Sequence, residues 1–99
     1  MTDERFADIL KIVKMNLRID WGDDDKLIQH KIKRSLKYFE TITGATLDFT
    51  DDSAELELLL ERVRYDWNNA LDDFEVNFKR EIFALIMTKA VEAEPDGED

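Results

Sequence analysis

The chain has 99 residues and a formal net charge of −10, and its length is sufficient for one domain with a modest core. It contains no cysteine, which excludes disulfide frameworks, thiolate zinc sites and cysteine nucleophiles. It holds no run of the roughly 20 apolar residues that span a membrane, and Asp3, Glu4 and Arg5 stand where a signal peptide would be apolar. We therefore expect a soluble cytoplasmic protein with no membrane partner, and a small core that would gain stability from further burial against a partner.

The first predicted helix begins after Thr2 or Asp3, whose side chains can cap free N–H groups, and ends near Arg18. Its apolar residues share one helical face: Phe6, Ile9, Leu10, Val13 and Leu17. Gly22 and the aspartates at 23–25 then favour a turn. The second helix is expected to start at one of these three aspartates, which can accept hydrogen bonds from its free N–H groups and complement its dipole.

The second helix has an inner apolar face and a glycine stop. The face consists of Ile28, Ile32, Leu36, Phe39 and Thr43. Gly44 is well placed to take the left-handed conformation that closes a helix. A loop over 45–52 follows, in which Leu47 and Phe49 are expected to anchor to the core, and Ser53 or Asp52 caps the next helix.

From residue 54 to 90 the apolar residues keep one helical phase, which allows either a single long helix or two helices. A break near 68–73 is the preferred interpretation, because Asn68, Asn69, Asp72 and Asp73 are poor helix formers. The sequence thus predicts an all-α bundle of about four helices in one domain over residues 1–92. Residues 93–99 have nothing to bury and are predicted to form a disordered acidic tail.

Residues that could support catalysis or bind metal have simpler explanations. The aspartates from Asp20 onward lack the glutamate that a calcium loop needs at its twelfth position, where Lys31 stands. His30 is the only histidine and has neither a ligand set nor a nucleophile beside it. Carboxylate pairs such as Glu57 with Glu61 arise from composition alone, and three isolated glycines cannot form a phosphate loop. We expect no enzyme activity, no metal and no cofactor.

The charge is unevenly divided between the two halves. Residues 1–50 carry nine basic and nine acidic side chains, whereas residues 51–99 carry five basic and fifteen acidic ones. One face of the second helix gathers the basic stripe, defined as Lys26, His30, Lys33, Arg34 and Lys37. The stripe lacks the Asn, Gln or aromatic residues that read bases, which disfavours specific DNA binding. It is either a solvated face or a surface that pairs with acidic residues of a neighbouring copy, such as Glu57 and Glu61.

Order and spacing of short motifs resemble the head-tail connector, or head-completion adaptor, proteins of long-tailed bacteriophages and prophages. The first half carries Leu17-Arg18-Ile19-Asp20, the acidic residues at 23–25, Leu27-Ile28, Tyr38 with Glu40, and Thr43-Gly44. The second half carries Leu58-Leu59-Leu60, Arg64-Tyr65, Asn69, Phe74, Phe78, Ile82 and Leu85. The resemblance extends over residues 6–88. It rests on the order and spacing of the motifs, because each motif alone is common.

This resemblance implies a structural virion protein at the head-tail interface, made in the host cytoplasm. Members form a homo-oligomeric ring under the portal protein, extend the DNA channel and offer a docking surface to the tail or to a second connector protein. A monomer in isolation is compatible with this role, because ring closure on a template follows mass action. DNA would pass through an acidic channel without specific binding, because like charges repel.

Two other classes of protein are compatible with this sequence. A small helical protein of net charge −10 could be a phage regulator that mimics DNA, although its first half is balanced in charge. It could also be a plain dimeric bundle.

Trp21, in the turn, is a candidate partner contact, because aromatic side chains anchor interfaces. Trp67 is in phase with Val63 and Leu71 and is expected in the core.

Overall fold

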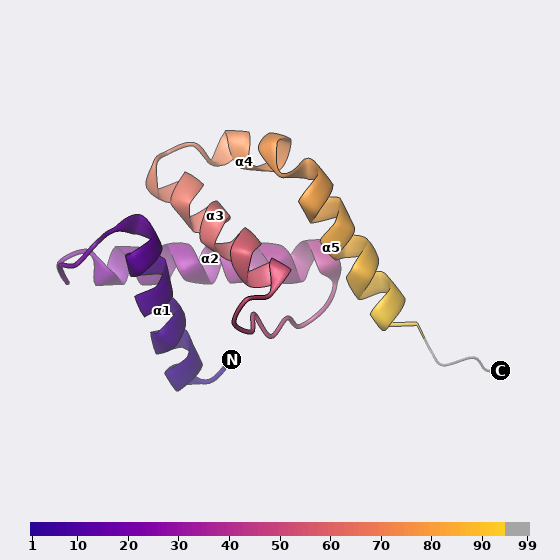
Figure 1. The fold of residues 1–99 in the computed structure, drawn as a ribbon, viewed down its shortest axis with the longest axis horizontal. Helices are drawn as coiled ribbons and strands as arrows, with labels where there is room; N and C mark the ends of the chain where they lie inside the picture. The colour runs from indigo at the N-terminus through magenta and orange to yellow at the C-terminus, as the bar shows by residue number, and fades with distance from the viewer. Residues whose placement is uncertain (95–99) are drawn as a thin grey trace.

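The computed structural model describes residues 1–94 and builds them from five helices without a strand in that range (Figure 1). These are α1 (Asp3–Leu17), α2 (Asp25–Thr43), α3 (Ala54–Trp67), α4 (Leu71–Asn77) and α5 (Lys79–Glu92). The all-α prediction is confirmed, whereas four helices is wrong by one. The extra boundary lies at Phe78, whose backbone leaves the helical region at φ −114° and ψ 21°.

Helix α2 forms the central support of the bundle, because it contacts α1, α3 and α5 (Figure 1). Each neighbour adds its apolar face to a single core. The apolar side chains with at most 1% exposure come from four helices and the loop after α2: Ile9, Val13, Ile28, Ile32, Phe39, Phe49, Leu59, Val63 and Phe74. The core therefore joins both halves of the chain, as one domain requires.

The corner between α1 and α2 is closed by the backbone rather than by its aspartates. Arg18 adopts a left-handed conformation (φ 60°), and the N–H of Ile19 donates to the Lys14 carbonyl at 2.9 Å while its side chain is buried. The predicted capping by aspartate is wrong at the N-cap of α2, because the carboxylate of Asp24 caps no N–H group. It accepts instead from Trp21 Nε1 at 2.8 Å. At the start of α1, the predicted cap by Thr2 is confirmed.

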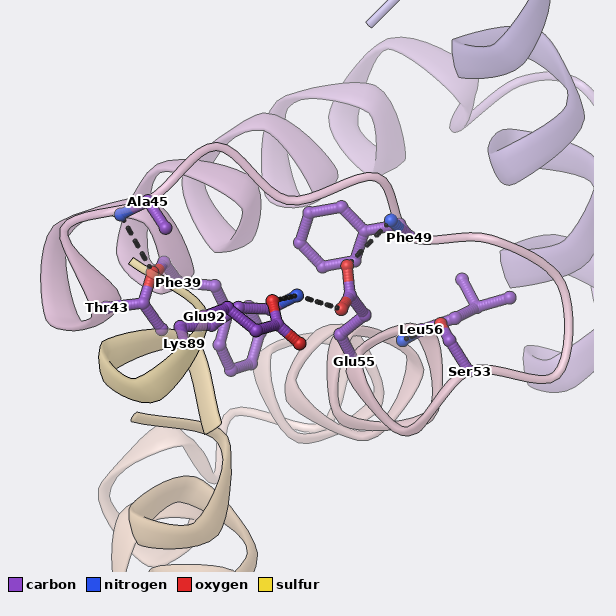
Figure 2. Close-up of polar contacts among 9 residues, drawn as sticks. All are labelled: Phe39, Thr43, Ala45, Phe49, Ser53, Glu55, Leu56, Lys89 and Glu92. Atoms are coloured by element: carbon purple, nitrogen blue, oxygen red, sulfur yellow. Dashed lines mark hydrogen bonds and ion pairs between the residues drawn. The ribbon is translucent and has the colours of Figure 1, made fainter. Parts of the chain in front are cut away.

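Side chains hold the loop between α2 and α3 in place (Figure 2). Gly44 closes α2 at φ 66°, as predicted. Phe49 is buried, and its N–H donates to Glu55 Oε2 at 2.9 Å, which ties the loop to the first turn of α3. Ser53 caps α3 by accepting from the N–H of Leu56 at 3.0 Å. The predicted loop anchors and the cap at Ser53 are thus confirmed.

The predicted break after Trp67 is confirmed. Asn69 takes a left-handed conformation at φ 57°, and the N–H of Ala70 donates to the Tyr65 carbonyl at 2.8 Å. Phe74 of α4 then fills the junction, with ring centroids 6.3 Å from Phe39 and 5.9 Å from Tyr65. The turn redirects the chain so that α4 and α5 cover the end of α3 (Figure 1).

Helix α5 lies at the edge of the molecule and is held by a two-sided ion pair. Lys89 Nζ contacts Glu55 Oε1 at 3.2 Å and Glu92 Oε1 at 3.1 Å (Figure 2). The hydrogen bonds to these carboxylates raise the pKa of Lys89 above its usual value. Beyond α5, Ala93 and Glu94 complete a final turn through a bond from Glu94 N to the Val91 carbonyl. The remaining residues of the predicted tail, 95–99, lie outside the described residues.

Candidate interaction surfaces

All five residues of the basic stripe are exposed on α2. Two of them already have intramolecular contacts: Lys33 Nζ lies 5.5 Å from the centroid of the Phe6 ring, and Arg34 pairs with Asp66 at 3.3 Å. Lys26, His30 and Lys37 make no salt bridge within residues 1–94. Lys26 and Lys37 therefore carry charge that a neighbour could use, and His30 lies exposed on the same face.

The contact that occupies Arg34 is the buried carboxylate of Asp66 on α3. Its side chain is 7% exposed and accepts from Lys31 Nζ at 3.0 Å and from Arg34 at 3.3 Å. Sequence reasoning missed this pair. A signal was present, because Asp66 follows Leu59 and Val63 on the inner face of α3, where an acid needs a basic partner.

A second polar contact between α2 and α3 is centred on Arg62. Its guanidinium donates to the buried Ser35 Oγ at 2.9 Å and stacks 4.1 Å from the Tyr38 ring centroid. Burial lowers the pKa of Arg62, which nevertheless stays charged at neutral pH. Burial also raises the pKa of Tyr38 to about 12, helped by the hydrogen bond that its hydroxyl donates to Glu75 Oε2 at 2.9 Å. These contacts fix the rotation of α2 against α3, and hence the direction of the basic stripe.

An acidic groove of about 650 Å³ runs over α3 toward α5, with Asn16 of α1 at its margin. Its lining includes the acidic residues Glu55, Glu57, Glu61, Glu81 and Glu92, the apolar residues Leu58, Leu60 and Leu85, and Lys89, which pairs with Glu55 and Glu92. Both acids predicted for the subunit interface thus line one groove. Glu61 is partly engaged by Arg64 through an ion pair, whereas Glu57 is exposed and makes no salt bridge within residues 1–94.

The α1–α2 corner exposes large apolar side chains. Trp21 is 45% exposed and is held by its bond to Asp24, while Met15 and Leu27 on the flanking helices are also exposed. Trp21 is therefore accessible, as a contact residue must be. Trp67 is half-buried and packs against the core, in agreement with its predicted place.

Among residues 1–94, no group of three His, Asp or Glu side chains is placed to hold a metal ion. Within the same range, no helix is long and apolar enough to cross a membrane. The chain matches no protein-family model, no curated protein and no solved structure. The surfaces themselves must therefore carry any functional argument.

Proposed function

We propose that this protein is a structural subunit of a homo-oligomeric ring, and specifically a head-tail connector that binds under the portal of a long-tailed bacteriophage head. The observation that carries this proposal is the presence of two unlike charged faces on one small helical body. Lys26, His30 and Lys37 are exposed on α2 and make no salt bridge within residues 1–94, and the acidic groove presents Glu57 and Glu61. The motif resemblance over residues 6–88 supplies the specific role.

Two unlike faces favour a ring because each copy can offer its basic face to the acidic face of the next. Such a head-to-tail contact repeats around an axis and closes when the rotation permits. The contact would be electrostatic and partly exposed, so it would weaken with salt and depend on a portal template for closure. Acidic side chains left over toward the axis would repel phosphate and let DNA pass without specific binding.

The competing role as a DNA mimic fits the surface less well. A mimic needs carboxylates spread over one presented face, whereas five basic side chains are exposed together on α2 of this molecule. Its expected partner would be a DNA-binding protein, and it would require no second copy of the chain. Binding assays with phage heads separate the two roles.

The decisive experiment is binding to purified, DNA-filled heads that carry the portal, measured by co-sedimentation. Wild type should bind in a salt-dependent manner, in several copies per head, and support attachment of the tail or of a second connector. Lys37→Glu and Glu57→Lys should each reduce the number of bound copies, and a mixture of the two variants should recover part of it. Lys11→Glu, which changes an exposed lysine of α1, is the matched control.

The outcome that contradicts the proposal is a chain that never co-sediments with portal-bearing heads at any salt concentration. A chain that binds as a single copy would contradict the ring. If Lys11→Glu were as damaging as Lys37→Glu, binding would follow total charge rather than the basic stripe.

A further inference from the structure

The outer face of α5 carries an apolar row with a positive and a negative end. Phe83, Met87 and Val91 are 63%, 48% and 62% exposed, although they are large and apolar. Arg80 precedes them and Glu94 follows them, and both are exposed. At 100° per residue the four positions within α5 fall within about 80° of one another around the helix, and Glu94 lies two residues beyond the end of α5. We call this set the α5 row.

The α5 row faces away from the core and from the acidic groove. The core receives Ile82 and Leu85 of α5, and the groove receives Glu81 and Thr88, all on other sides of the helix. Since α5 lies at one edge of the molecule (Figure 1), nothing within residues 1–94 covers the row. An apolar patch of a few hundred Å² is about the size of the largest patch on an ordinary monomer, and such a patch is often functional.

The row is symmetric about Met87. Phe83 and Val91 stand four residues to either side of it, and Arg80 and Glu94 stand seven residues to either side. Two copies of α5 placed antiparallel across a two-fold axis at Met87 would therefore align Phe83 with Val91, Met87 with itself and Arg80 with Glu94. Arg80 in α5 and Glu94 in the turn after it stand at opposite ends of the row, so both charge pairs form in the same arrangement. A parallel pair would instead place like charges together.

We propose that a second copy of this chain covers the α5 row, as an antiparallel two-fold pair of α5 helices. Charge complementarity favours a second copy as the partner, because each chain carries both the basic and the acidic end of the row in matching register. The interface is isologous, so the same contact forms twice. Its two-fold symmetry limits the assembly to two copies.

The exposed area sets the strength of this pair. From the exposed fractions, the three apolar side chains offer roughly 300 Å² per copy, given the 150–250 Å² of an aromatic residue. The total is below the 1,200 Å² or so of a stable interface, which places the pair among weak, reversible associations. We therefore expect a dissociation constant in the micromolar range.

This inference goes beyond the proposed ring, because the ring would use the basic stripe and the acidic groove and leave the α5 row free. The pair would keep apolar surface covered while chains accumulate in solution. Dimer formation and binding to heads are separate measurements, so either proposal can fail while the other holds.

The absence of cysteine makes the register directly testable. Met87→Cys should form an intermolecular disulfide rapidly under mild oxidation, because Met87 meets itself across the axis. Phe83→Cys and Val91→Cys should each crosslink slowly alone and rapidly when mixed. Met15→Cys, at another exposed methionine, is the control and should crosslink slowly. Equal rates for Met87→Cys and Met15→Cys would overturn the proposed register.

Sedimentation measurements from about 10 to 500 µM test the association itself. Wild type should shift from monomer toward twice the chain mass, and Met87→Glu, which brings two carboxylates together at the axis, should weaken association at least tenfold. Arg80→Glu and Glu94→Arg should each weaken it, and the double variant should restore it. A wild-type monomer throughout this range, or an unaffected Met87→Glu variant, would refute the pair. Circular dichroism confirms that these surface variants stay folded.

Discussion

Replacing Asp66 with asparagine should destabilise the protein more than any other conservative change of a carboxylate. The side chain is 7% exposed and accepts from Lys31, itself only 15% exposed, and from the half-exposed Arg34. Removing one member of a buried pair costs about 3–5 kcal/mol, because the remaining charge stays buried without a partner. Asparagine keeps one acceptor and Arg34 stays hydrated, so we expect a loss of about 2 kcal/mol for Asp66→Asn and about 3 kcal/mol for Asp66→Ala.

Thermal and urea denaturation, followed by circular dichroism, would measure this loss. A cost of about 2 kcal/mol lowers the melting temperature by roughly 8–16 °C in a domain of this size. Asp72→Asn, at an exposed carboxylate on α4, is the matched control and should change stability by less than about 0.5 kcal/mol. If Asp66→Asn behaved like this control, the ion pair between α2 and α3 would not be a stabilising contact and the reasoning would be refuted. The double variant Lys31→Met with Asp66→Leu should recover most of the loss, because it leaves no buried charge.

Three further predictions concern the junctions between helices. Phe74→Ala should cost about 3–5 kcal/mol in denaturant unfolding, because it empties the junction of α3 and α4, and an unchanged melting temperature would contradict its burial. Between pH 10 and about 12 the folded protein keeps a proton on Tyr38 that the unfolded chain has lost, so the free energy of unfolding should fall as the pH rises. Tyr38→Phe should show a shallower fall, and identical slopes would contradict the raised pKa. At the left-handed turn, Asn69→Ala should lose about 1 kcal/mol and Asn69→Gly should lose less, as measured by thermal melting.

Much of the fold could be predicted because the local signals agree. The apolar periodicity gives the inner faces of α1, α2 and α3, Gly44 gives the end of α2, and the asparagines give the break after Trp67. The boundary at Phe78 could not be predicted, because the apolar phase continues through it. Its cause is tertiary: the Phe78 ring packs 5.2 Å from Phe74 and 5.7 Å from Tyr65, and the backbone bends to allow this.

The candidate surfaces were predictable as positions on helices but not as sets of free charges. Helical spacing correctly places the basic stripe on one exposed face of α2. Helical spacing does not predict that Arg34 pairs with Asp66 or that Lys33 lies over Phe6, because both contacts depend on how α1 and α3 cross α2. The aspartate cluster shows the same limit, since Asp24 and Asp25 bind Trp21 and Lys14 rather than capping a helix.

The attachment of α5 has a dynamic consequence. Only Ile82 and Leu85 of this helix are buried, each with 8% exposure, and the ion pairs of Lys89 with Glu55 and Glu92 hold its far end. A helix with so few buried contacts opens at a lower free energy than the rest of the molecule. Amide hydrogens should accordingly exchange first in α5 and last in α2, with the aromatic junction around Phe78 as the hinge. The chain would then behave as a stable four-helix body, α1 to α4, that carries a detachable arm.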